Sequence, residues 1–265
     1  AGRPVTRPVV VVVAVAALRE LTGRDQQQGH ATAHHPHRPS VRSRARRWNG
    51  TVFVYGHADH NLSNSLVADM GEMGKATLGE GVNLIVMADW DSSQQAGDGG
   101  EGFPGGTEWY RIPGGDAAPE LLLREDEQNL DDPAVLAAAV ERAFTDYPAD
   151  RYGLILWDHG GAWVGGYGSD SQNGTDEAPT AMAVPALAAA VRDALAAAGV
   201  TGVDGAPPLE FLAFDTCLMG GAEVASELAN LSAVYIANAE IDYGDGWDYE
   251  ATMTLLSEQP DITAT

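Results

Sequence analysis

The decisive stretch of the sequence is Leu156-Trp157-Asp158-His159-Gly160-Gly161-Ala162-Trp163. It continues an apolar run over Gly153–Trp157, and a short apolar run that ends in polar residues and glycine predicts a buried parallel strand. The glycines after His159 let backbone N–H groups approach a ligand without an intervening side chain. The sequence therefore predicts an imidazole at the end of a strand, on a loop that is open to a ligand.

A second stretch has the same design. It is Phe214-Asp215-Thr216-Cys217-Leu218-Met219-Gly220, and it follows an apolar run over Leu209–Phe214. A helical pattern separates the two runs, so together they predict a β-loop-α-β unit. The carboxyl ends of parallel strands meet at the edge where open α/β sheets bind ligands. A thiol and an imidazole at that edge are the parts of a cysteine nucleophile and its proton shuttle.

The chain from Trp48 onward alternates predicted strands and helices. Further strands are expected at Thr51–Tyr55, Val82–Ala88, Glu108–Ile112 and Ala233–Ala237. This alternation predicts an α/β domain whose mostly parallel sheet is sandwiched between helices. We assign the domain to residues 48–265. Its last expected helix begins near Ala251 and runs into the end of the sequence, as in a domain truncated at its C-terminus.

Residues 1–47 form a basic N-terminal segment with nine arginines and two acidic residues, a net charge of about +7. Arg3 and Arg7 precede the apolar run Val9–Leu18, which is too short to span a bilayer. A basic start before such a run fits a secretory signal region and favours an exported, extracellular bacterial protein. The alternative is a strand followed by a disordered basic tail.

The remaining 218 residues carry 36 acidic and six basic side chains, a net charge of about −30. Such a field repels phosphates, so a nucleic-acid partner is not expected. It favours cationic substrates, cations such as calcium, or a high-salt environment; a solvated acidic surface with no target is the ordinary alternative.

Calcium is considered because one acidic loop offers hard oxygen ligands. The candidates are Asp89, Asp91, Asp98 and Glu101, although their spacing matches no EF-hand. No cofactor is expected to be required, and no metal is assigned to the catalytic site.

Cys217 is the only cysteine of the chain, and His159 lies 58 residues before it. A lone cysteine is often a buried apolar residue. Together with a histidine elsewhere in the chain, it becomes a candidate nucleophile, and caspases carry that histidine about 50 residues upstream. The spacing therefore favours catalysis by this pair.

With these residues in view, the chain resembles the clostripain family of caspase-fold cysteine peptidases. Two further stretches support the resemblance, Val52–Leu62 and Ala237–Tyr249. In the first, Gly56 and His57 stand where the family usually has a Met-Ala pair. The resemblance implies a caspase-like fold and a cysteine endopeptidase that cleaves after Arg, and less readily after Lys, with a Cys-His dyad.

The resemblance also implies an oxyanion hole built from the backbone N–H groups of Gly160 and Cys217, and a specificity pocket that contains Asp215 and Asp245. Asp215 lies two residues before Cys217, so on an extended strand both side chains point to the same side. Two carboxylates suit a guanidinium, which forms bidentate pairs. The expected partners are therefore peptide or protein substrates with basic residues.

Two local expectations concern the neighbours of the dyad. A helix that starts just beyond Cys217 would favour the thiolate through its N-terminal dipole. Asp158 is expected to be a structural loop carboxylate, because adjacent residues at a strand end point to opposite sides.

Two other functions stay open: a non-catalytic caspase-fold module that binds peptides, and an acyl-transfer enzyme that uses the same dyad. A serine hydrolase is disfavoured, because the sequence contains no Gly-x-Ser-x-Gly motif.

Overall fold

The computed structural model describes residues 10–14, 48–97, 100–168, 181–203, 205–242 and 246–258. The strands are β1 (Val10–Ala14), β2 (Gly50–Ala58), β3 (Val82–Trp90), β4 (Gly106–Arg111), β5 (Glu120–Glu125), β6 (Tyr152–Trp157), β7 (Leu209–Asp215) and β8 (Ser232–Asn238). The helices are α2 (Ser63–Lys75), α3 (Pro133–Asp146), α4 (Ala162–Gly165), α5 (Val184–Ala197), α6 (Ala222–Leu228) and α7 (Tyr249–Glu258).

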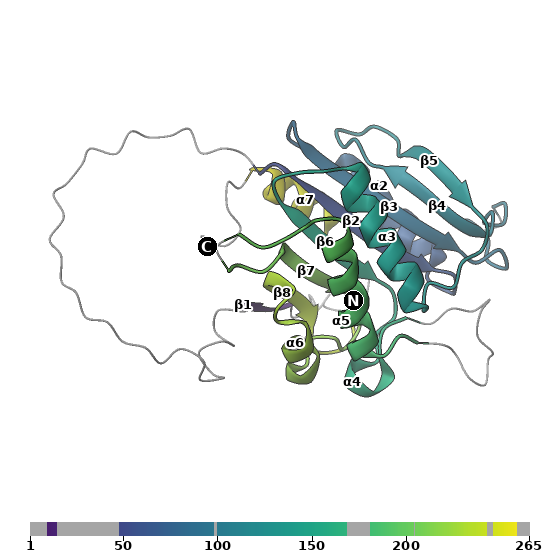
Figure 1. Cartoon of the computed structure of the whole chain (residues 1–265). Coiled ribbons are helices and arrows are strands. Elements are labelled where there is room, and N and C mark those ends of the chain that lie inside the picture. Colours follow the sequence, from purple (N-terminus) through teal and green to yellow (C-terminus); the bar gives the residue numbers. More distant parts are fainter. Residues whose placement is uncertain are drawn as a thin grey trace, which may run out of the picture.

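The strands form one sheet in the order β1-β8-β7-β6-β2-β3-β4-β5 (Figure 1). The five central strands, from β8 to β3, are parallel, whereas β1, β4 and β5 pair antiparallel at the two edges. The predicted mostly parallel α/β fold is confirmed. Within the segment of residues 1–47, Val10–Ala14 contribute a strand to this sheet.

Strand β5 is not predicted by the sequence pattern. None of its side chains is fully buried, so it lacks the alternation of apolar and polar residues that marks a strand on a core. Its pairing with β4 holds it in the sheet.

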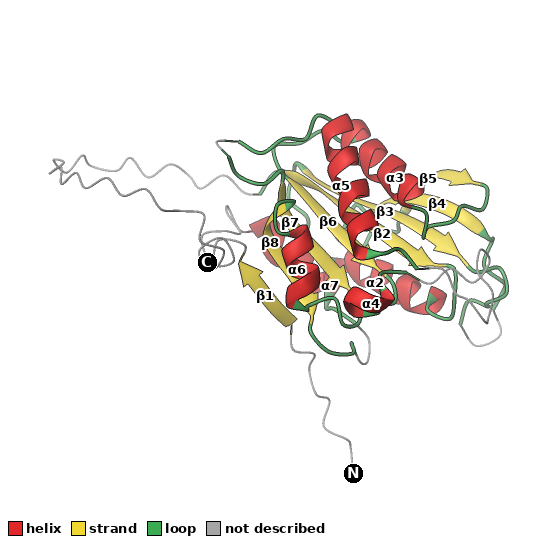
Figure 2. Cartoon of the chain, turned by 60° about the horizontal axis from the view of Figure 1, so that its bottom comes forward, coloured by secondary structure: helices red, strands yellow, loops and turns green. Residues whose placement is uncertain are grey.

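Helices cover both faces of the sheet (Figures 1 and 2). Helices α3, α5 and α6 pack on one face over Phe53, Tyr55 and their neighbours. Helices α2 and α7 pack on the other face over Val52 and Val54. Because successive residues of β2 face opposite cores, this strand is apolar at consecutive positions, as expected of a central parallel strand.

The start of α3 is determined by its sequence. The carboxylate of Asp132 accepts a hydrogen bond from Ala134 N, and Pro133 occupies the first helical position, where its missing N–H leaves no bond unmade. Among the described residues, no helix is long and apolar enough to cross a bilayer.

The register of the central strands fixes the geometry of the site. Trp157 of β6 pairs with Asp215 of β7 on one side and with Gly56 of β2 on the other. The loops that follow β2, β6 and β7 therefore leave the sheet side by side at its carboxyl edge. His159 and Cys217 each lie two residues beyond the pair Trp157–Asp215.

Candidate active site

His159 lies on the loop after β6, and its half-buried ring lines a pocket at the carboxyl edge of the sheet. Its Nε2 lies 3.0 Å from Oδ1 of Asn61, and its backbone N–H donates to the carboxylate of Asp158. Burial lowers the pKa of the imidazole, against the opposing charge of Asp158. A neutral imidazole that can accept a proton is what a general base requires.

Cys217 lies in a turn after β7 and lines the same pocket. The next residue, Leu218, has a φ of 64°, a left-handed conformation that is uncommon for a leucine. Hydrogen bonds from Leu218 N to Glu240 O (3.0 Å) and from Gly220 N to Asn238 O (2.7 Å) hold this turn. The backbone N–H of Asp242 donates to Sγ of Cys217 at 3.4 Å.

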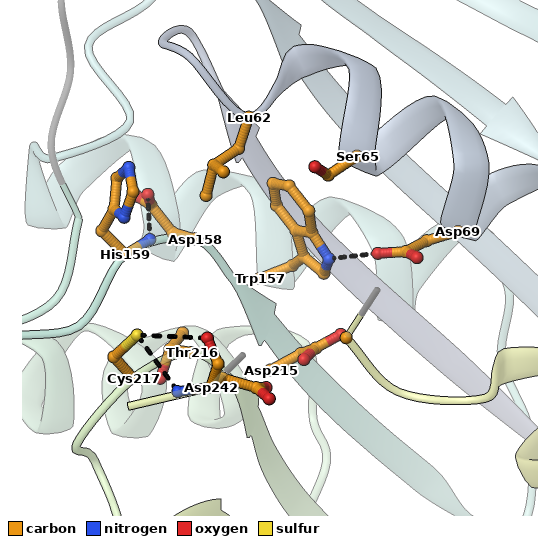
Figure 3. Close-up of a pocket in the computed structure, with 11 residues that line it drawn as sticks. Leu62, Ser65, Asp69, Trp157, Asp158, His159, Asp215, Thr216, Cys217 and Asp242 are labelled. Atoms are coloured by element: carbon orange, nitrogen blue, oxygen red, sulfur yellow. Dashed lines mark hydrogen bonds between the residues drawn. The ribbon is translucent and has the colours of Figure 1, made fainter. Parts of the chain in front are cut away.

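The helix expected just beyond Cys217 begins later than predicted. Helix α6 starts at Ala222, and Gly221 is its N-cap. Since the dipole effect falls off within the first turn of a helix, α6 does not supply the predicted stabilisation of a thiolate at Cys217. The sulfur instead contacts the backbone of Asp242, whose N–H donates to Sγ and whose carbonyl oxygen accepts from the thiol at 4.0 Å (Figure 3).

Gly160 lies where the loop after β6 contacts the loop after β7. A Cβ atom at this position would overlap the carbonyl oxygen of Cys217, and it would also come within 3.0 Å of Oγ1 of Thr216. Any other residue would therefore push the two loops apart. The two residues expected to form the oxyanion hole, Gly160 and Cys217, are packed against each other at the pocket.

The pocket that His159 and Cys217 share has a volume of about 160 Å³. It is lined by Leu62, Ser65, Asp69, Trp157, Asp158, His159, Asp215, Thr216, Cys217, Asp242 and Gly246. Figure 3 shows the imidazole and the thiol on the left, and the carboxyl groups of Asp69 and Asp215 on the right. The candidate nucleophile and base thus lie at one end of the pocket, and the carboxyl groups of Asp69 and Asp215 lie at the other.

Asp215 is buried in the pocket wall, where the hydroxyl of Tyr249 donates to its Oδ2 at 2.8 Å. Burial raises the pKa of its carboxyl well above the usual value, and the nearby carboxylates of Asp69 and Asp242 raise it further. Asp242 is within hydrogen-bond reach of Asp215, and burial also raises its pKa. Two carboxyl groups can form a hydrogen bond only when a proton lies between them.

Asp69 and Asp242 are pocket residues that the sequence analysis missed. Asp69 belongs to α2, where it accepts a hydrogen bond from Nε1 of Trp157 at 2.7 Å. The sequence did contain a signal for Asp69. It is a carboxylate on the face of α2 that otherwise carries the apolar residues Leu66, Met70 and Met73. Asp245, expected to line the pocket, lies outside the described residues.

Asp158 was predicted to be a structural loop carboxylate, and the structure gives it two imidazole partners. Its Oδ2 lies 2.6 Å from Nδ1 of His57, and its Oδ1 lies 2.7 Å from Nε2 of His60. Burial would raise the pKa of this carboxyl, but the charges and hydrogen bonds of the two imidazoles outweigh burial and lower it to about 2. No described hydrogen bond joins Asp158 to the ring of His159, which agrees with the expected geometry.

The acidic group that the structure assembles is not the predicted one. Asp89 meets Asp59 and Glu127, with carboxylate oxygens within 4.8 Å of one another. Asp91 instead accepts a hydrogen bond from Ser93 N (2.7 Å), and Asp98 lies outside the described residues. Burial raises the pKa of Asp89 to about 8, and the charge of Glu127 adds to the shift.

A mostly parallel sheet between helices, with a thiol and an imidazole on adjacent loops at its carboxyl edge, is the architecture of caspase-like proteins. Within this class, the chain belongs to the clostripain family, whose model matches residues 54–264. It is 29% identical over 231 residues to clostripain of Hathewaya histolytica. That alignment covers 76% of this chain and 40% of the relative.

Two solved structures are similar to this chain. One is a secreted C11 cysteine protease from Bacteroides thetaiotaomicron in complex with an irreversible peptide inhibitor, with a TM-score of 0.63 and 26% identity over 81% of this chain and 56% of that one. The other is an inactive zymogen C11 protease from Parabacteroides distasonis, with a TM-score of 0.58 and 20% identity over 82% of this chain and 56% of that one. The chain spans about half the length of the relatives it matches.

Proposed function

We propose that the protein is a cysteine endopeptidase that cleaves peptide bonds after arginine, and less readily after lysine. The observation that carries the proposal is one pocket lined by Cys217 and His159 together with the acidic residues Asp69, Asp215 and Asp242. Membership of the clostripain family supports the peptidase class. Peptides and proteins with basic residues are the corresponding substrates.

In the proposed reaction, His159 takes the proton of the Cys217 thiol, and the thiolate attacks the carbonyl carbon before the cleaved bond. The backbone N–H groups of Gly160 and Cys217 stabilise the oxyanion that forms. His159 then returns the proton to the leaving amine, and water hydrolyses the acyl-enzyme with His159 as base. The chemistry requires no cofactor.

The preference for arginine follows from the state of the carboxyl groups. The raised pKa values of Asp215 and Asp242 favour their protonated forms when the pocket has no counter-charge. A guanidinium would replace those protons, since it forms bidentate pairs and presents a planar fork to two carboxylates. A pocket of about 160 Å³ is smaller than most drug-sized ligand sites and suits one side chain.

Asp215→Ala tests this specificity. We expect kcat/KM for peptides with Arg before the cleaved bond to fall by well over tenfold, because a desolvated charge pair is worth about 2–5 kcal/mol. Alkylation of Cys217 by a small neutral reagent should keep the rate of the parent protein. Asp193→Ala, which removes an exposed carboxylate on α5, is the matched control and should leave both rates unchanged. A peptide library that shows a preference for Asp, Asn or a large apolar residue would overturn the proposed specificity.

We also propose that the protein is exported. The support is the basic, apolar start of the sequence and the likeness to a protease that is described as secreted. For calcium we propose a site at Asp59, Asp89 and Glu127, whose carboxylate oxygens lie within 4.8 Å of one another. Assays with a calcium chelator test this site: unchanged activity and thermal stability would rule it out.

A further inference from the structure

The loop after β2 lies against the ring of His159. Two consecutive residues of this loop touch the ring. Oδ1 of Asn61 lies 3.0 Å from Nε2, and the ring of His60 lies 4.6 Å from the ring of His159, centroid to centroid, at 41°. Neither residue lines the pocket, so neither meets the substrate there.

The contact with Asn61 selects one tautomer of His159. A carbonyl oxygen only accepts hydrogen bonds, so Nε2 of His159 must carry the hydrogen. In a neutral imidazole the other nitrogen, Nδ1, then holds the lone pair. Nδ1 is therefore the atom that can take the proton of the Cys217 thiol.

The loop that carries Asn61 is itself fixed. His60 accepts a hydrogen bond from Leu62 N at Nδ1 (3.2 Å), so its Nε2 donates to Asp158. The hydroxyl of Ser63 donates to the carbonyl of Ala58 at 2.6 Å and lies 3.0 Å from that of His60. Asp158, which also accepts from the backbone N–H of His159, thus ties the loop after β2 to the loop after β6.

We infer that Asn61 is a positioning residue for His159: its amide oxygen holds the imidazole as the Nε2–H tautomer and aims Nδ1 for proton transfer from Cys217. The inference rests on the proposed Cys-His chemistry. It predicts a role in turnover and none in substrate affinity, because Asn61 contacts the ring and not the pocket.

Asn61→Ala and Asn61→Asp test the inference with an arginine peptide substrate. The side chain is exposed, so neither change removes core packing. In Asn61→Ala we expect kcat to fall by about tenfold or more with KM nearly unchanged, a part of the about 10²–10⁴-fold that a positioned acid–base group contributes. Asn64→Ala is the matched control: it removes an exposed asparagine three residues on, which bonds to Gln95 and Gly97 instead.

Asn61→Asp separates positioning from a structural role. An aspartate still accepts from Nε2–H, so most of kcat should return. Its negative charge should also raise the pKa of His159, whose charged neighbours are Asp158, His57 and His60, and so move the acid limb of the pH–rate profile to higher pH. A kcat within threefold of the parent in Asn61→Ala, or an Asn61→Asp variant as slow as Asn61→Ala with an unshifted profile, would overturn the inference. Cys217→Ala, measured in parallel, separates failure of the positioning role from failure of the proposed function. Activity in Cys217→Ala would refute the Cys-His dyad itself, whatever the Asn61 variants show.

Discussion

The loops after β2 and β6 leave neighbouring strands at the same edge of the sheet, and each brings histidine to it with a different result. His159, after β6, is half-buried, lines the pocket and has a lowered pKa. His57, near the end of β2, and His60, on the loop after it, are buried and engage the carboxylate of Asp158. The same side chain thus lines the pocket as a candidate base on one loop and joins a buried hydrogen-bond network on the other.

The difference lies in the partners and not in the residue type. An imidazole that donates to a buried carboxylate is fixed in one tautomer and shielded from substrate. An imidazole with one nitrogen bonded to Asn61 and its other side on a pocket keeps a lone pair for chemistry. Four predictions test this division, beginning with the largest effect.

Replacing the proposed reagents should abolish turnover and spare the fold. We expect Cys217→Ala and His159→Ala each to lower kcat by at least about 10³-fold. Their free energies of unfolding in urea should stay within about 1 kcal/mol of the parent, since neither residue is fully buried. Retained peptidase activity in Cys217→Ala would contradict the assignment of the nucleophile.

Removing the shared carboxylate should act on stability first. Asp158→Ala removes the nearest carboxylate from two buried imidazoles, His57 and His60, and breaking a buried pair typically costs about 3–5 kcal/mol. Urea unfolding measures the loss. Asp146→Ala is the control, because it breaks an exposed pair with Arg142 and should cost less than about 1 kcal/mol. Equal losses of unfolding free energy in Asp158→Ala and Asp146→Ala would show that the buried network stabilises the fold no more than an exposed ion pair does.

The contribution of Asp158 should fade in acid. Its pKa is about 2 in the folded protein and 3.8 in the unfolded chain, so the folded state favours the ionised form. The resulting stabilisation, about 2 kcal/mol, is complete above pH 3.8 and is lost as the pH falls through 2. The stability difference between the parent and Asp158→Asn should therefore shrink over this window. A difference that is constant from pH 5 to pH 2 would argue against an ionised Asp158.

The same substitution on the two loops should have opposite consequences. His60→Phe keeps a ring beside His159 but loses the donor to Asp158, so we expect about 1–2 kcal/mol less stability and a loss of activity below tenfold. His159→Phe should be inactive with near-parental stability. Thermal unfolding and peptide hydrolysis, measured on both variants, make the comparison. An inactive but fully stable His60→Phe would place His60 among the reagents.

The sequence predicts the central fold well because β6 and β7 are buried on both faces. Their apolar runs end in polar residues and glycine, and this pattern alone locates His159, Cys217 and Asp215 at one edge. The edge strand β5 escapes prediction because pairing with β4 and not burial defines it. The late start of α6 escapes too, since the turn at Leu218 depends on hydrogen bonds to Asn238, the last residue of β8, and to Glu240 beyond it.

The sequence spacing of His57, His60 and Asp158 could not predict their network. The histidines lie at the end of β2 and Asp158 follows β6, and His60 and Asp158 are 98 residues apart in the chain. A signal was nevertheless present. His57, Asp59 and His60 are polar residues at the end of a buried strand, and buried polar groups need partners. Such a cluster predicts a hydrogen-bond network, although only the neighbouring strand shows which carboxylate completes it.

The pairing of Trp157 with Asp215 has a consequence for how genes of this kind can vary in length. Since the thiol and the imidazole each follow that pair by two residues, their relative placement depends on the residue count between the pair and each side chain. Deleting one codon just before His159 or Cys217 would therefore shift that side chain relative to the other. Insertions between Trp90 and β4 leave this count untouched. Length polymorphism among homologous genes should therefore accumulate in the connecting loops and be absent from Ile155–His159 and Ala213–Cys217.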